Sequence, residues 1–351
     1  MSTRRAAWTA VCAVTVVAAL APLPQAWIES WYSRGLYRWI QRILTTASNL
    51  SPLPLFDGLL LAAVAAAAVA TYRAVRARGW KRGTLRAGRI LVCAAAVVYL
   101  VFLATWGLNY RRVPLTSKLA FDTARITPAA ARELAARTVR ALNALYAGAH
   151  DGDTDLTRLA AAFHSAERAL SASAASAGSG SPATVLGRPK STLLGGYFHY
   201  TAIAGMTDPF FLETLIASDL LDVERPFVIA HEWGHLAGYA DESEANYIAW
   251  LTCMRGDERA QYSGWLALLG SVQPFLERGQ SPVLDIGPRI DVYAIRYRYT
   301  RTSPMLRAAA REAYDRYLKA NRVERGIESY EAVLQLILGT ALDPSGNPRG
   351  R

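Results

Sequence analysis

Long uncharged stretches near the N-terminus constrain what this chain can fold into. Residues 6–28 and 90–110 contain no charged side chain. Each run is long enough to cross the hydrocarbon core of a bilayer, about 30 Å, as a helix. A third apolar stretch, residues 54–72, carries a single acid, Asp57, near its start. The sequence therefore predicts three transmembrane helices at these positions.

The distribution of basic residues gives these helices a direction. Between positions 73 and 89, in the connection between the second and third helices, lie seven basic residues and no acid. Because Lys and Arg favour the cytoplasmic side, the third helix should lead outward. We expect a multi-pass anchor over residues 1–112 in the cytoplasmic membrane, and an extracytoplasmic domain over residues 113–351. The alternative for the first run, preceded by Arg4 and Arg5, is a cleaved secretory signal.

Segment 29–49 carries aromatic and aliphatic side chains at helical spacing among basic ones. The apolar members are Trp31, Tyr32, Leu36, Trp39, Ile40 and Ile43, and the basic ones are Arg34, Arg38 and Arg42. This pattern predicts an interfacial helix along the outer surface of the lipid bilayer. The alternative is an ordinary helix packed on the domain that follows.

The formal net charge of +11 raises the question of a nucleic-acid partner. Nine of the basic residues lie in two acid-free segments beside the apolar runs, and the remaining 30 nearly balance the 28 acidic residues. A nucleic-acid-binding face would instead spread Lys and Arg over the folded domain. We therefore expect no nucleic-acid partner.

The part of the chain after residue 112 is predicted to be mainly α with a small β-sheet, an α+β fold. Helices are expected at 129–147, after the helix start Thr127-Pro128, at about 155–170, and over most of the chain from residue 225 onward. Aromatic and β-branched runs at 197–203 and 210–216 are strand candidates. Residues 171–184, rich in Ser, Ala and Gly, predict a flexible loop.

The sequence His-Glu-Trp-Gly-His, from His231 to His235, follows an apolar helix start. A helix places residues four apart on one face, so the two imidazoles can reach one zinc ion while Glu232 stands beside it. The three cysteines cannot supply a Cys-based zinc site, because Cys12 and Cys93 lie inside apolar runs. The pattern predicts Zn²⁺ bound by His231 and His235, with Glu232 as the catalytic base.

A catalytic zinc ion usually has three protein ligands, and three acids follow the histidines closely. Asp241 is suited to capping a second helix, on which Glu244 shares an apolar face with Ile248 and Leu251. Glu244 is therefore the predicted third ligand. Two alternatives stay open: Asp241 or Glu242 replaces it, or Glu244 only bonds the amide of Asp241 in a capping box.

These residues resemble a bacterial family of membrane-anchored, zincin-like proteins of unassigned function. The resemblance lies in residues 231–239, 242–248, 106–111, 205–210, 314–319 and 326–330. It implies N-terminal transmembrane helices, a zincin-like metallopeptidase domain of the gluzincin type, and a zinc site of His231, His235 and Glu244. The Glu-Ala-Asn element at Glu244 is also similar to that of cytoplasmic HExxH peptidases that cleave repressors. The spacing from His235 to Asp241 fits other clans, whose third ligand follows the second His by six residues.

The expected function is that of a membrane-bound zinc endopeptidase, which hydrolyses peptide bonds of a peptide or protein substrate in the cell envelope. Glu232 would take a proton from water and deliver it to the leaving amine. By analogy with zincins, the strand predicted at 197–203 would pair with an extended substrate, and His199 on it either stabilises the oxyanion or packs. The alternative function is a non-proteolytic zinc-binding envelope protein that recognises a partner or is structural. The general base favours the enzyme, and the sequence assigns neither substrate nor oligomeric state.

Overall fold

The computed structural model describes residues 2–173, 183–277, 279, 281–321 and 333–351. Most of the loop predicted at 171–184 lies outside these ranges, as do residues 326–330 of the family resemblance.

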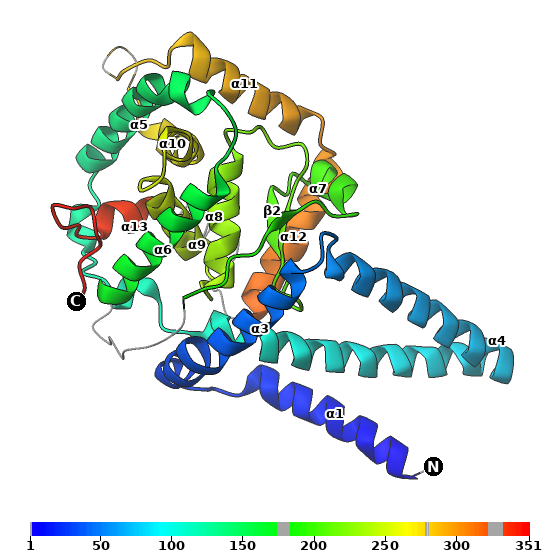
Figure 1. Cartoon of the computed structure of the whole chain (residues 1–351). Coiled ribbons are helices and arrows are strands. Elements are labelled where there is room, and N and C mark those ends of the chain that lie inside the picture. Colours follow the sequence, from blue (N-terminus) through cyan, green and yellow to red (C-terminus); the bar gives the residue numbers. More distant parts are fainter. Residues whose placement is uncertain (1, 174–182, 278, 280, 322–332) are drawn as a thin grey trace.

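The fold is mainly α-helical with one small sheet, as predicted (Figure 1). The elements are α1 (Ser2–Leu20), α2 (Gln25–Trp27), the π-helix η1 (Ile28–Leu36), α3 (Tyr37–Asn49), α4 (Leu55–Thr105), the 3₁₀ turns η2 (Gly107–Arg111), η3 (Leu115–Ser117) and η4 (Thr123–Arg125), α5 (Pro128–Ala149), α6 (Leu156–Ser173), β1 (Pro189–Lys190), α7 (Gly195–Thr201), β2 (Gly205–Thr207), β3 (Thr214–Ile216), α8 (Arg225–Leu236), α9 (Glu242–Cys253), α10 (Glu258–Val272), η5 (Gln273–Phe275), α11 (Ile286–Thr300), α12 (Pro304–Ala320) and α13 (Val333–Gly339).

The first apolar run does not form one helix over 6–28, so that prediction is wrong. Helix α1 ends at Leu20, and the chain bends by 104° before it continues through Gln25–Asn49. Pro22 and Pro24 lie in the break. Proline lacks an amide hydrogen and its ring clashes with the preceding turn, which explains why an apolar run of sufficient length is interrupted here.

Helix α4 contains the second and third apolar runs as the two arms of a hairpin. Its backbone is helical except at Gly79, where φ is 70° and ψ is 170°, a conformation that glycine adopts at little cost. Figure 1 shows the two arms of α4 meeting far from the body of the molecule. Among the described residues, α4 is the helix long and apolar enough to cross a membrane, and the bent pair Trp8–Leu20 with Gln25–Asn49 meets that test only when taken together.

The base of this hairpin is fixed to the sheet of the following domain. The amides of Leu55 and Phe56, at the start of α4, donate to the two carboxylate oxygens of Glu213 at 3.1 and 2.9 Å. Lys190 pairs with the same carboxylate at 2.6 Å, and both side chains are buried. The next residue, Asp57, accepts a hydrogen bond from the amide of Leu193. The hairpin therefore starts from a rigid attachment.

Helix α3 packs on the domain, in agreement with the alternative reading of segment 29–49. Its buried side contains polar side chains beside the core residue Tyr37: Gln41 donates to the carbonyl of Val185 and Thr45 to that of Leu212. Two large apolar side chains face outward, Trp39 and Ile43, which are 59% and 65% exposed, whereas Ile40 and Leu44 pack against the core. Contact of this outer face with lipid remains a prediction.

The helices expected after residue 112 are confirmed, with Thr127 capping α5 by accepting the amide of Ala130. The almost fully buried helix α9 lies at the centre, packed against α6, α8, α10 and α13. One continuous core joins this centre to side chains of the N-terminal segment, including Tyr37, Phe102 and Trp106.

The strand predicted at 197–203 is wrong, because α7 covers most of this segment. Its burial follows helical spacing: Phe198 and Thr201 are buried, whereas Tyr197 and Tyr200 are each 51% exposed. Of the run at 210–216, only the last three residues form a strand. The sheet has the order β1-β3-β2, with β1 parallel and β2 antiparallel to β3, so β2 is an edge strand.

Candidate metal centre

Helix α8 carries both histidines of the HExxH sequence on one face. It begins with Pro226 in its first turn, a position that favours proline, and buries most of its residues. The ring centroids of His231 and His235 lie 4.7 Å apart. Gly234 lets α9 approach closely, since a Cβ there would lie 2.7 Å from the side chain of Ile248 and 3.3 Å from Cα of Ala245.

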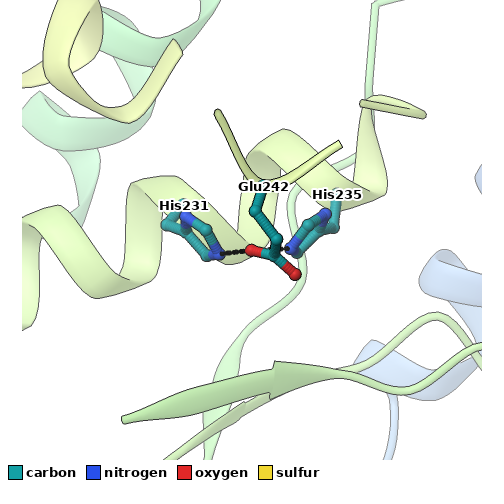
Figure 2. A group of neighbouring side chains, drawn as sticks. All are labelled: His231, His235 and Glu242. Carbon is teal, nitrogen blue, oxygen red and sulfur yellow. Dashed lines mark ion pairs between the residues drawn. The ribbon is translucent and has the colours of Figure 1, made fainter. Parts of the chain in front are cut away.

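A carboxylate from α9 reaches both histidines. Oε2 of Glu242 lies 3.2 Å from Nε2 of His231 and 3.6 Å from Nε2 of His235 (Figure 2). The three ligand atoms lie within 4.8 Å of one another. This arrangement of two imidazole nitrogens and one carboxylate oxygen could hold a metal ion.

The structure corrects the prediction that Glu244 is the third member of this group. Oε1 of Glu244 accepts a hydrogen bond from the amide of Leu115, away from the histidines. Asp241 caps α9 as expected, because its carboxylate accepts the amides of Ser243 and Glu244. Of the three acids, Glu242 takes the position assigned to Glu244, and the capping box does not form.

The sequence pointed to Glu244 rather than Glu242 because α9 is buried on nearly all sides. Every residue of the helix except Asn246 is buried, so an apolar stripe cannot identify the side that faces α8. The closest approach to Gly234 involves Ala245 and Ile248. Glu242 is three residues before Ala245 and therefore shares its face, whereas Glu244 points about 100° away from Ala245.

Neighbouring groups hold two of the three side chains in position. Nδ1 of His235 lies 2.7 Å from the carbonyl oxygen of Tyr239, to which it donates, leaving the lone pair of Nε2 for a metal. The hydroxyl of Tyr314 donates to Oε1 of Glu242. Nδ1 of His231 is buried and has no hydrogen-bond partner among the residues that the structure describes.

The cluster favours an ionised carboxylate. Burial alone would raise the pKa of Glu242, but the adjacent charge of His235 and hydrogen bonding to both histidines lower it overall. Burial likewise opposes charge on His235, yet Glu242 raises the pKa of that imidazole to about 9. Without a metal ion, positive charge on His235 balances the negative charge of the buried Glu242 carboxylate, as a bound cation would.

Glu232 lies beside the cluster on the same helix. Burial raises its pKa, although the nearby His231 and His235 oppose this shift. The hydroxyl of Thr207 lies 2.8 Å from its Oε2. A Cβ on Gly205 would lie 2.7 Å from its Oε1, so glycine at this position of β2 leaves room for the carboxylate. A carboxylate with a raised pKa at such a place is suited to general-base catalysis.

Other residues weighed from the sequence lie outside this group. His199 is on α7, where Nδ1 lies 2.7 Å from Oδ2 of Asp219 in a pocket that Arg298 also lines. Sequence reasoning assigned no role to Thr207 or Tyr314. Both lie in segments that carry the family resemblance, at 205–210 and 314–319. This resemblance was the feature of the sequence that could have pointed to them.

The fold and site define a mainly α-helical protein with a candidate membrane hairpin and a buried His-His-Glu cluster able to hold a metal. The chain belongs to the family described as protein of unknown function (DUF3810), whose model matches residues 32–338. No curated protein and no solved structure matches the chain.

Proposed function

We propose that this protein is a membrane-bound, zinc-dependent endopeptidase with a zincin-like domain of the gluzincin type. Its zinc ligands are His231, His235 and Glu242, and Glu232 is its general base. The single observation that carries the proposal is the buried carboxylate of Glu232 next to three converging ligand atoms. A structural zinc ion needs the ligands but has no use for such a base.

The donor set fits zinc, because two imidazole nitrogens and one carboxylate oxygen are a ligand set that catalytic zinc sites use. A zinc ion bound there supplies Lewis acidity, which polarises a carbonyl and acidifies water. Glu232 then accepts the proton of the attacking water and delivers it to the leaving amine. Thr207, bonded to Oε2 of Glu232, fixes the direction in which this carboxylate faces.

An extended substrate has a strand to pair with beside this base. β2 is the edge strand of the sheet, and its residues Gly205 and Thr207 both approach the side chain of Glu232. Pairing of a peptide with the main chain of β2 would bring the peptide past the general base. Addition of a strand to a sheet edge is a common mode of peptide recognition. This strand replaces segment 197–203 as the proposed substrate edge.

The proposed location is the cytoplasmic membrane, with the metal centre on the outer side. The two arms of α4 would cross the bilayer, and the seven basic residues near Gly79 would remain in the cytoplasm. The ends of α4 then emerge on the side where the domain lies, as Figure 1 shows both arms leading back to the body of the molecule.

One observation favours a second candidate, a non-proteolytic zinc-binding envelope protein. Glu232, His235 and Glu242 are only 3%, 7% and 2% exposed, so the cluster is less accessible than the cutting of a protein substrate requires. In this reading zinc holds α8 and α9 together, and the domain recognises a partner.

The test compares cells that carry the wild-type chain with cells that carry Glu232→Gln, which keeps all three ligands. Peptides of the outer envelope are identified by mass spectrometry, and Glu312→Gln, an exposed change on α12, is the control. An endopeptidase yields cleavage products in the wild type and control that Glu232→Gln lacks. Identical peptides in all three strains, with about one zinc per purified chain, would support the non-proteolytic candidate instead.

A further inference from the structure

The end of α8 that carries His235 is held by residues of the N-terminal segment. The last carbonyls of a helix have no partner within the helix, so they accept hydrogen bonds from elsewhere. The indole nitrogen of Trp106 donates to the carbonyl of His235 at 3.1 Å, and the hydroxyl of Tyr37 donates to that of Leu236 at 2.9 Å. Both donors are buried and come from outside the domain that contains the histidines.

Trp106 also contacts the imidazole of the same histidine. The two rings meet edge to face, with centroids 5.9 Å apart and planes at 79°. Trp106 follows the last residue of α4 and is held in turn by the rings of Phe102 and Tyr110, at centroid distances of 6.3 and 5.0 Å. Its position is therefore set by the end of the membrane hairpin.

A third contact, from Arg112, reaches the turn that follows His235. Arg112 donates to the carbonyl of Gly238 at 2.7 Å, and its guanidinium lies 4.8 Å from the centre of the Tyr239 ring. Tyr239 is the residue whose carbonyl accepts Nδ1 of His235. Glu29 binds Arg112 through two hydrogen bonds of 2.9 Å each and so ties this turn to η1.

We infer that Trp106 and Tyr37 are positioning residues for the metal ligand His235, so that the N-terminal segment completes the metal centre rather than only tethering it. This inference rests on the proposed function. It explains why donors of the N-terminal segment converge on His235, Leu236 and Gly238, where a shift of the helix end would move Nε2 of His235 away from Glu242. Groups of this kind around metal ligands typically change metal affinity by about 10- to 100-fold when they are removed.

The experiment uses the full chain in detergent with Trp106→Phe, Tyr37→Phe and the double variant. Each substitution keeps an aromatic ring in the core and removes one donor. Trp80→Phe, at the tip of α4 where the side chain is 75% exposed, is the matched control. Zinc affinity is measured by competition with a chelator. The absorption spectrum of the Co²⁺-substituted protein reports the geometry of the ligands, and the thermal midpoint of the metal-free protein reports folding.

The double variant should bind zinc about 10-fold more weakly or worse, with an altered Co²⁺ spectrum and a cooperative unfolding transition retained. Tyr37→Phe, which loses a single hydroxyl, should show a smaller loss in the same direction if the double variant does not fold. Unchanged affinity and spectrum in the variants that fold, or an equal loss in Trp80→Phe, would overturn the inference. A wild-type chain that binds no zinc would instead refute the proposed function.

Discussion

The hydroxyl of Tyr314 on α12 donates to Oε1 of Glu242, the oxygen turned away from the two histidines. The carboxylate is thereby held with Oε2 facing both Nε2 atoms. A residue 72 positions away in the sequence thus fixes the orientation of a candidate metal ligand.

Tyr314→Phe should weaken zinc binding by about 10-fold, because the carboxylate of Glu242 loses the donor that orients it. The measurement is the zinc dissociation constant from chelator competition. Tyr293→Phe on α11, where the side chain is 70% exposed, is the control and should bind as the wild type does. Equal affinity for Tyr314→Phe and wild type would show that this hydrogen bond does not support the site.

Glu242→Ala should abolish stoichiometric zinc binding, whereas Glu244→Ala should retain it. Glu244→Ala should instead lower the free energy of unfolding by about 1–3 kcal/mol, because the buried amide of Leu115 loses its acceptor. Metal content by atomic emission and denaturant unfolding of the metal-free chains distinguish the two effects. The opposite pattern, with zinc lost only in Glu244→Ala, would restore the sequence-based assignment.

Stability at low pH should depend on Glu167, which joins α6 to Arg38 on α3. Burial opposes its ionisation, but a hydrogen bond with His164 and the charge of Arg38 lower the pKa of Glu167 to about 2. A carboxyl whose folded pKa lies below its unfolded value of 4.5 stabilises the protein above pH 4.5. This contribution, on the order of 3 kcal/mol at most, is lost as the pH falls from 4.5 toward 2.

The check is urea unfolding at pH 6 and pH 3 for the wild type and Glu167→Gln. The free energy of unfolding should fall between these pH values by less in the variant than in the wild type. The same fall in both proteins would mean that other carboxyl groups account for the acid sensitivity.

The orientation of the hairpin can be tested with a reporter that is active only outside the cytoplasm. Fused after Lys118, which follows α4, the reporter should be active, and fused after Gly79 at the tip of the hairpin it should be inactive. The seven basic residues between 73 and 89 are the physical reason. Activity after Gly79 alone would place the metal centre in the cytoplasm.

Features of the fold and site that depend on residues close in the sequence could be predicted, whereas features that depend on contacts between distant segments could not. The spacing of His231 and His235 fixes their geometry once the segment is helical, and α8 has that helix. The choice among the three acids depended on how α9 crosses α8, which is set by the close approach at Gly234. A helix buried on nearly all sides gives no amphipathic pattern from which this crossing can be predicted.

In segments 197–203 and 29–49, too, tertiary contacts decided the structure. The aromatic residues of 197–203 favour a strand by composition, but the tertiary contacts of Phe198 select a helix. In segment 29–49 the predicted apolar set is divided, because Tyr32 is buried in the core whereas Trp39 and Ile43 are exposed. The polar side chains Gln41 and Thr45 are also packed against the protein. Helical periodicity alone cannot say which face of a helix points inward.

The attachment of α4 to Glu213, Lys190 and Asp57 limits how the domain can move relative to lipid. A flexible stalk would let the metal centre sweep through a volume above the bilayer and reach many bonds of a substrate. The first arm of the hairpin is hydrogen-bonded at its base to Glu213, and Trp106, which follows the second arm, donates to α8, the helix that carries both histidines. These contacts would hold the metal centre at one distance from the lipid surface. If α4 lies in a membrane and the protein is the proposed endopeptidase, this attachment would select scissile bonds by their distance from the lipid surface as well as by their sequence.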